Sequence, residues 1–203
     1  MINPDNSFYQ TIGKEAIAEF KDRGSRFIAY AFPVSSAEDF KKRRKELKEE
    51  HPKAAHHCFA YRIGNDGNNF RSSDDGEPPG SAGKPILGQI DSKGLTNTAV
   101  VVARYFGGTL LGVPGLINAY KTATSFALQS SLILKKPVLR NYRLQFDYTI
   151  LNEVMRIIKK YDCLVLKQEL QLFCLIEAGI PASDIEQCLR QLKNLKSMEL
   201  SAI

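Results

Sequence analysis

The spacing of hydrophobic positions predicts a mixture of strands and helices along the first two thirds of the chain. Short apolar runs bounded by turn residues are typical of strands, and apolar positions three or four residues apart are typical of helices. The strand pattern occurs over residues 16–20, 26–32, 56–63, 70–72 and 98–105. Helix signals occur from Ser35-Ser36 to near Pro52, over residues 85–90, and from about Gly115 to Leu132.

The last of these helices has a clear apolar face and precedes a change of pattern. Its inward positions are four, three and four residues apart: Leu116, Tyr120, Ala123 and Ala127. Lys135-Lys136-Pro137 then indicates a link between domains. Because 203 residues suffice for two small cores, we expect an amino-terminal domain over residues 1–136 and a carboxy-terminal domain over 137–203.

The carboxy-terminal domain has the predicted order strand, helix, strand, strand, helix, strand. The strands are expected over residues 141–148, 163–168, 170–177 and 197–203. The first helix has Leu151, Val154, Met155 and Ile158 on one face, and residues 181–184 begin the second. This order matches a ferredoxin-like domain and makes the fold class α+β. No clear turn separates the two middle strands, so their register stays open.

Basic residues are concentrated in the amino-terminal domain. The chain has 28 Lys and Arg against 22 Asp and Glu, a net charge of +6. Residues 1–136 have 19 basic and 14 acidic side chains, hence +5, whereas residues 137–203 have 9 and 8, hence +1. This asymmetry favours an anionic partner such as RNA or the ribosome, although excess charge also aids solubility. Without a membrane-length apolar run or a secretory signal, we expect a cytoplasmic protein with no membrane partner.

Two glycine-rich stretches, residues 71–85 and 104–120, lie on either side of the buried strand predicted over 98–105. Glycine permits backbone angles and close approaches that side chains forbid, so the two stretches predict a shaped backbone surface. In the second stretch, the amides of Gly107 and Gly108, flanked by Arg104 and Lys121, are suited to an anion-binding concavity. Tight turns and close helix–sheet packing are the structural alternative, and the two interpretations are compatible.

The first stretch only partly resembles a phosphate-binding loop. Gly80, Ser81, Gly83 and Lys84 precede a predicted helix, whose first amides are suited to a phosphate of RNA. A P-loop requires glycine at position 78 and Ser or Thr at position 85, and both are proline here. The pattern therefore excludes a nucleotide-binding P-loop and leaves a weaker RNA-contact hypothesis.

Asp74, Asp75 and Glu77 form an acidic group in the same stretch. Carboxylates are ligands for divalent cations, but Asp followed by Gly is also common turn chemistry. We favour the structural role, since a lone acidic cluster is a poor catalytic signature. His56-His57-Cys58 is no better a catalytic set, because alternation along a strand sends His57 to the opposite face.

Three other features predict no specific chemistry. The four cysteines form no C-x-x-C pair and are most simply small buried residues. The basic run 41–45 is suited to phosphates, but the acidic residues that follow it favour a solvated helix face. We therefore expect no catalytic residue, no metal and no cofactor.

The two glycine-rich stretches together resemble the YigZ–Impact family. The first matching segment is Asp74-Asp75-Gly76-Glu77-Pro78-Pro79-Gly80-Ser81-Ala82-Gly83-Lys84-Pro85, and the second is Val100-Val101-Val102-Ala103-Arg104-Tyr105-Phe106-Gly107-Gly108. The resemblance implies an amino-terminal domain like elongation factor G domain four (ribosomal protein S5 domain 2-like). It also implies a carboxy-terminal domain like domain five of that factor. Three departures are Ser81 for threonine, Pro114 for glycine, and Asn118 for a basic residue, and the last two weaken the anion-binding interpretation.

The resemblance also sets the functional expectation. Eukaryotic relatives act in translational control by binding the activator of an amino-acid-starvation kinase. We therefore expect a noncatalytic, translation-associated protein that contacts RNA or the ribosome through its basic domain. The candidate binding residues are Asp75, Glu77, Gly80, Ser81, Gly83, Lys84, Arg104, Gly107, Gly108 and Lys121. Alternatives are a protein–protein regulator of translation or stress signalling, and a metal-assisted enzyme using Asp74, Asp75 and Glu77 on a phosphorylated small molecule.

Overall fold

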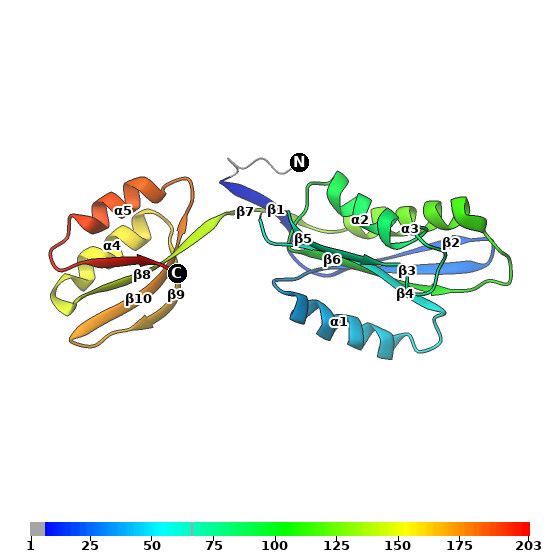
Figure 1. Cartoon of the computed structure of the whole chain (residues 1–203), viewed down its shortest axis with the longest axis horizontal. Helices are drawn as coiled ribbons and strands as arrows, with labels where there is room; N and C mark the ends of the chain where they lie inside the picture. Colours follow the sequence, from blue (N-terminus) through cyan, green and yellow to red (C-terminus); the bar gives the residue numbers. More distant parts are fainter. Residues whose placement is uncertain (1–6, 66) are drawn as a thin grey trace. The chain divides into compact units, whose positions relative to one another are not determined.

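The structure, a computed structural model, describes residues 7–65 and 67–203. Its contacts divide the chain into two units, one over Tyr9–Lys136 and the other over Pro137–Ile203 together with Ser7 and Phe8. Each unit has a sheet with helices packed against it (Figure 1). Residues 1–6 and Asp66, which follows the strand predicted over 56–63, lie outside the described part.

A five-stranded antiparallel sheet forms the first unit, with the strand order β2-β3-β6-β4-β5. The strands are β2 (Ala16–Asp22), β3 (Ser25–Pro33), β4 (His56–Ile63), β5 (Asn69–Ser73) and β6 (Thr98–Tyr105). Every strand predicted here from the apolar pattern is present, within two residues of its expected ends. The continuous apolar run places β6 in the middle of the sheet, where almost its whole length is buried on both faces.

Three helices cover the two faces of this sheet. Helix α1 (Ala37–Glu50) packs on one face, and α2 (Gly83–Ser92) and α3 (Gly112–Gln129) pack on the other (Figure 1). Alternation along β6 supplies both cores, because Val100 and Val102 face α2 and α3 whereas Val101 faces α1. The inward residues predicted for α3 are all buried.

The predicted end of α3 was wrong, whereas the boundary between the two units does fall within the predicted link, between Lys136 and Pro137. The helix ends at Gln129, where the hydroxyls of Ser130 and Ser131 donate to carbonyl oxygens of its last turn. Residues Ile133–Pro137 then form strand β7, which pairs with β1 (Phe8–Ile12). Local periodicity does not reveal such short strands, because their hydrogen bonds join residues far apart in the sequence.

The second unit contains the predicted order of elements. Strand β8 (Leu139–Asp147) leads through a 3₁₀ turn (Tyr148–Ile150) into α4 (Leu151–Lys160). Strands β9 (Leu164–Glu169) and β10 (Phe173–Pro181), helix α5 (Ile185–Lys193) and strand β11 (Glu199–Ala202) follow. The sheet order is β11-β8-β10-β9, and all neighbouring strands are antiparallel. The open hairpin register pairs Leu175 with Glu169, with a bulge between Glu177 and Ala178.

One inward position of α4 was predicted incorrectly. Met155 is 37% exposed, and Ile157 is buried with Val154 and Ile158 instead. The buried face of α4 is therefore rotated from the predicted one, toward Ile157 and away from Met155. No helix in the described part of the chain is both long and apolar enough to cross a membrane.

Candidate functional site: a buried clamp beneath the glycine-rich loops

Asp74 organises the first glycine-rich loop. Its carboxylate accepts hydrogen bonds from the backbone N–H groups of Gly80, Ala82 and Gly83, at 2.8, 3.0 and 2.8 Å. Burial by itself raises the pKa of Asp74, but these three donors outweigh it and hold the pKa below its ordinary value. The amides that the sequence offered to an RNA phosphate at the start of α2 therefore already donate to a carboxylate within the loop.

Gly83 and Ser81 have structural roles in this loop. A Cβ atom on Gly83 would lie 2.7 Å from the backbone nitrogen of Ser73, so only glycine lets the helix start pass so close to β5. The buried Ser81 hydroxyl donates to the carbonyl oxygen of Pro78 at 2.6 Å. As predicted binding residues, Gly83 and Ser81 are thus buried parts of the loop, while Lys84 is exposed at its end.

Asp75 ties the same loop to α1 and β4. One carboxylate oxygen lies 2.8 Å from Arg44 Nη2 and 3.7 Å from Lys48 Nζ, and the other accepts the backbone N–H of His57 at 2.8 Å. Its carbonyl oxygen accepts from His56 Nδ1, also at 2.8 Å. Asp75 adopts a left-handed backbone angle, with φ of 43°. These contacts hold a strained turn in place.

A buried polar cluster joins the two glycine-rich stretches. Glu77, whose side chain is 3% exposed, accepts hydrogen bonds from Arg104 Nη1 at 2.6 Å and from the Tyr120 hydroxyl at 2.7 Å. His56 Nε2 lies 4.0 Å from the same carboxylate oxygen. Burial raises the pKa of the Tyr120 hydroxyl. Glu77, Arg104 and Tyr120, here called the buried clamp, therefore connect the first loop to β6 and α3.

Cys58 lies against the buried clamp but is not poised as a nucleophile. Its sulfur lies 2.9 Å from the carbonyl oxygen of Asp74 and 3.2 Å from the Tyr120 hydroxyl oxygen, and both are acceptors for its single S–H. Burial raises the pKa of the thiol to about 12, so almost none of it is thiolate at neutral pH. The predicted alternation is confirmed, since His56 and Cys58 point toward the clamp and the side chain of His57 is on the other face of the sheet.

The three acidic residues of the first loop do not converge on one point. Asp74 accepts backbone amides, Asp75 pairs with α1, and Glu77 belongs to the buried clamp. Across residues 7–65 and 67–203, no group of three or more His, Cys, Asp or Glu side chains is placed to hold a metal ion. The geometry thus supports the structural interpretation of this acidic group.

Gly107 in the second loop is required for a close backbone approach. A Cβ atom there would lie 1.9 Å from the carbonyl carbon of Gly24, and its N–H donates to the Ser25 hydroxyl at 3.2 Å. This amide is therefore directed at the neighbouring turn. Gly108 adopts φ of 86° and has open space beside it, and Lys121 is exposed on α3.

The ten residues predicted to bind thus separate into three groups by exposure. Glu77, Ser81, Gly83 and Arg104 are buried, whereas Lys84, Gly107, Gly108 and Lys121 are exposed and Asp75 and Gly80 are intermediate. Tyr120 was predicted only as part of the apolar face of α3, so its place in the buried clamp was not foreseen. Nor did the sequence predict the exposure of the apolar side chains Phe106, Leu110 and Val113, which are 52%, 81% and 46% exposed.

The fold and these loops define a class of proteins in which an antiparallel sheet, covered by helices on both faces, carries two clamped glycine-rich loops and is followed in the chain by a second α+β unit. A family model described as the Impact N-terminal domain matches residues 23–128, which contain both loops. The chain is 34% identical to IMPACT family member YigZ of Escherichia coli (strain K12), over 88% of this chain and 90% of that protein. The chain therefore belongs to the IMPACT family.

Two solved structures are also similar to this chain. A crystal structure described only as that of a hypothetical protein is 31% identical, with a TM-score of 0.78 over 98% of both chains. A structure of the two-domain translational regulator Yih1 is 30% identical, over 64% of this chain and 49% of that one. Its TM-score is 0.36, so the likeness to Yih1 carries no argument about the fold.

Proposed function

We propose that this IMPACT family chain is a noncatalytic binding protein that contacts RNA or the ribosome through its amino-terminal unit. The observation that carries the proposal is the charge of residues 1–136, with 19 basic side chains against 14 acidic. An anionic polymer is the natural partner of such a surface.

Burial leaves the basic excess of the first unit unchanged, because the buried acid Glu77 is matched by the buried base Arg104. Glu77 is buried against Arg104, and Asp74 accepts amides inside its loop. Lys84 and Lys121 remain exposed. The surface that a partner meets therefore keeps the excess of basic residues counted from the sequence.

The chemistry of the buried clamp supports a noncatalytic role. The Cys58 pKa of about 12 and the raised Tyr120 pKa remove the two nearest candidate nucleophiles at neutral pH. Arg104 and Glu77 neutralise each other. The clamp is thus a device for holding two loops in a fixed arrangement.

The proposal includes the two domain relationships that the family resemblance implies. The sheet order β11-β8-β10-β9 with α4 and α5 supports a ferredoxin-like second unit, like domain five of elongation factor G. We assign the first unit to the domain-four fold of that factor. Proteins with the same fold often have different functions, so the binding test described next decides the function of this chain.

Sucrose-gradient sedimentation of the tagged protein tests the proposal. At low salt we expect co-migration with a ribosomal subunit, and at high salt we expect release, because contacts to phosphates displace counterions. Treatment with RNase should also remove the fast-sedimenting fraction. A protein that stays at the top of the gradient at low salt, or whose binding does not respond to salt, contradicts the proposal.

A second candidate function, a protein–protein regulator, is favoured by one specific observation. Phe106, Leu110, Val113 and Ile117 expose apolar side chains in the second loop and at the start of α3. Neighbouring exposed apolar groups are typical of surfaces that contact another protein. A pulldown from RNase-treated lysate separates the two functions, since a protein partner would survive the nuclease and an RNA-bridged one would not.

A further inference from the structure

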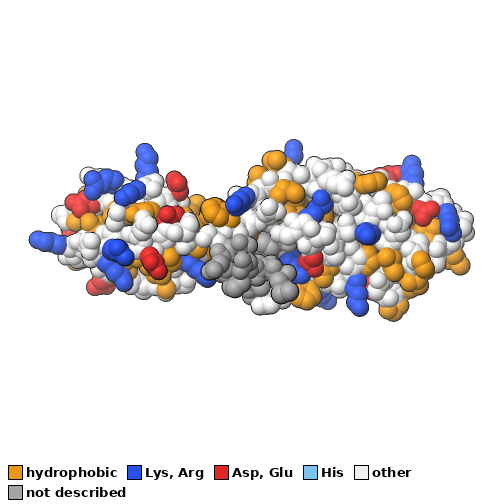
Figure 2. All heavy atoms as spheres, turned by 90° about the horizontal axis from the view of Figure 1, so that it is seen from above, with side chains coloured by type: hydrophobic (Ala, Val, Ile, Leu, Met, Phe, Trp, Pro, Cys, Tyr) orange, Lys and Arg blue, Asp and Glu red, His pale blue; other side chains and the backbone are white. Residues whose placement is uncertain are grey.

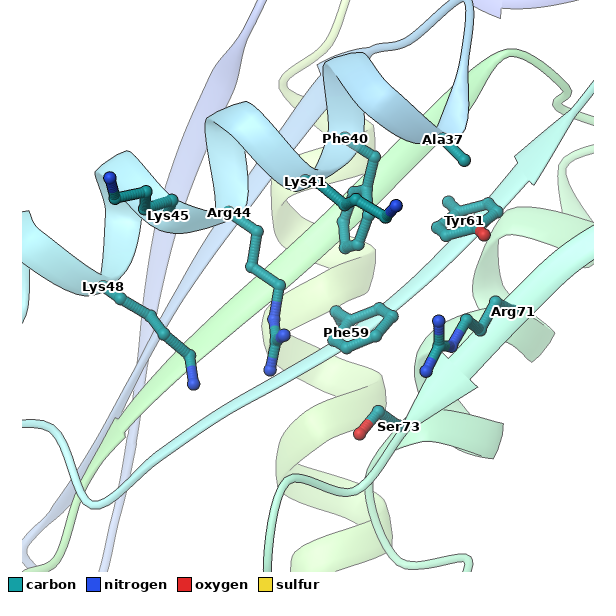
Figure 3. A pocket seen from close by; sticks show the side chains of 10 residues that line it. All are labelled: Ala37, Phe40, Lys41, Arg44, Lys45, Lys48, Phe59, Tyr61, Arg71 and Ser73. Atoms are coloured by element: carbon teal, nitrogen blue, oxygen red, sulfur yellow. The ribbon is translucent and has the colours of Figure 1, made fainter.

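A basic groove lies on the α1 face of the first sheet, on the side away from α2 and α3 (Figure 3). Its volume is about 610 Å³, and α1 and β5 form its walls. Five cationic side chains line it, namely Lys41, Arg44, Lys45, Lys48 and Arg71. We call these five residues and the space between them the α1 groove. None of them is among the candidate residues taken from the glycine-rich loops.

The fold produces this groove by separating charges that are interleaved in the sequence. Arg43 is directed away from the groove, where it pairs with Glu15, Glu46 and Glu50 at 2.8, 3.2 and 2.7 Å. Glu46 and Glu50, two acidic residues of α1, are thus paired outside the groove. Residues three and four apart share a helix face, so Lys41, Arg44 and Lys48 follow one another along the groove over about 10 Å.

Part of this positive charge is available to a ligand. Within residues 7–65 and 67–203, neither Lys41 nor Arg71 has a carboxylate at ion-pair distance. Lys45 approaches Glu49 only to 3.9 Å, and both side chains are well exposed, so this pair is weak. Arg44 and Lys48 share one carboxylate, that of Asp75.

The groove has a rigid wall and an aromatic floor. Arg44 is fixed between Asp75 and the ring of Phe59, with its guanidinium carbon 4.5 Å from the ring centroid. Figure 3 shows Arg44 and Arg71 on opposite sides of Phe59. Phe59 and Tyr61 are only 3% and 7% exposed, so the floor offers no deep apolar pocket.

We propose that the α1 groove binds the sugar–phosphate backbone of an RNA strand. This inference rests on the proposed function and names the surface that carries it out. Cations that repeat along one wall and face another cation across the groove suit a polymer with evenly spaced charges. An acidic protein segment fits less well, because a stable protein contact needs buried apolar or aromatic anchors in a pocket. Recognition through phosphates alone is independent of base sequence.

The opposite face of the same unit offers a weaker alternative. Figure 2 views the α2 and α3 side from above and shows Lys and Arg side chains scattered singly, with hydrophobic side chains between them. Lys84 and Lys121 belong to this sparser set of charges on α2 and α3. The α1 groove therefore takes precedence over the glycine-rich loops as the phosphate-contacting surface.

A matched pair of charge reversals in the full chain tests the inference. The groove variant is Lys41→Glu with Arg71→Glu, one change on each wall. The control is Lys42→Glu with Lys53→Glu, two exposed lysines outside the groove that give the same change in net charge. The probe is a fluorescently labelled single-stranded oligouridine, followed by anisotropy over a salt titration.

We expect the groove variant to bind at least about tenfold more weakly than the control, and the slope of log K against log salt to fall by roughly 1.4 for two lost phosphate contacts. The same positions can be neutralised to glutamine, as Lys41→Gln with Arg71→Gln in the groove and Lys42→Gln with Lys53→Gln in the control. The neutral groove variant should again bind RNA more weakly than its control, by a smaller factor. The neutral variants keep the test valid if a charge reversal perturbs folding, which circular dichroism would reveal.

Each other outcome has a defined meaning. If the wild-type chain binds RNA and the groove and control variants bind equally, the inference is wrong while the proposed function stands. Loss of binding in Lys84→Glu with Lys121→Glu would then assign the contact to the loop face. If the wild-type chain binds neither oligouridine nor ribosomes, the proposed function itself fails. Competition by polyglutamate as strong as by RNA at equal charge would overturn RNA in favour of an acidic protein.

Discussion

Replacing Glu77 by alanine should destabilise the first unit by about 3–5 kcal/mol, the usual cost of breaking a buried ion pair by removing one partner. The Glu77 and Arg104 side chains are only 3% and 7% exposed, so water cannot replace the lost carboxylate. The variant leaves the Arg104 guanidinium buried with no counter-charge. The Tyr120 hydroxyl also loses its acceptor, which lies 2.7 Å away in the wild-type protein.

Urea unfolding followed by circular dichroism measures this loss, and amide hydrogen exchange at Val101 and Val102 assigns it to β6. The matched control is Glu19→Ala, which removes a carboxylate 2.9 Å from Arg26 in a pair with side chains 33% and 49% exposed. An exposed pair of this kind contributes under about 1 kcal/mol. If Glu77→Ala costs no more than Glu19→Ala, the clamp does not stabilise the fold and the reasoning is refuted.

A double-mutant cycle tests the cause of the loss. In the wild-type background, Arg104→Met should be costly, because it leaves the Glu77 carboxylate buried without its cation. In the Glu77→Ala background the same change should cost little or should restore stability, since it removes the uncompensated charge. Equal costs in the two backgrounds would show that the pair is not coupled.

Further outcomes follow from the loops. Gly107→Ala should destabilise the first unit by about 3 kcal/mol or more, because the added Cβ atom would overlap Gly24. Gly88→Ala, in α2 with open space beside it, should stabilise the unit by about 0.5–1 kcal/mol. Thermal denaturation compares the two variants. Asp74→Asn should lower the stability by roughly 1 kcal/mol at neutral pH by weakening the cap on α2. The pKa of Asp74 in the folded protein lies below its ordinary 3.8, so the charged carboxylate stabilises the fold above that pH. This stabilisation is lost as the pH falls through the folded pKa. The difference in unfolding free energy between the variant and the wild type should therefore shrink in acid. A difference that is constant from pH 7 to pH 2 would rule out Asp74 as the source.

The glycine-rich loops were located correctly from the sequence, but the contacts that their residues make within the fold were not foreseen. Proline at positions 78 and 85 excluded a nucleotide loop without any structure. The sequence did not show that the amides of Ala82 and Gly83 already have a carboxylate acceptor, or that Gly107 is needed for packing against Gly24. Such facts depend on which segments meet in space.

The basic run 41–45 also takes on a different role in the structure than the sequence indicated. Along the sequence, its cations are followed closely by acidic residues, a pattern that favours a solvated helix face. Helical geometry directs Arg43 toward Glu46 and Glu50 on one side and Lys41 and Arg44 toward the groove on the other. The separated cations line a groove only because β5 brings Arg71 to the opposite wall.

By itself, the sequence determined the α+β class, the strands of the first sheet, the order of elements in the second unit and the family. These follow from local periodicity and from motifs that are contiguous in the chain. The tertiary structure alone decided that Glu77, Arg104 and Tyr120 form one buried cluster, that β1 pairs with β7, and that a basic groove lies on the α1 face. The physical reason is that electrostatic contacts and strand pairing act between residues close in space, and their separation along the chain leaves no local pattern to read.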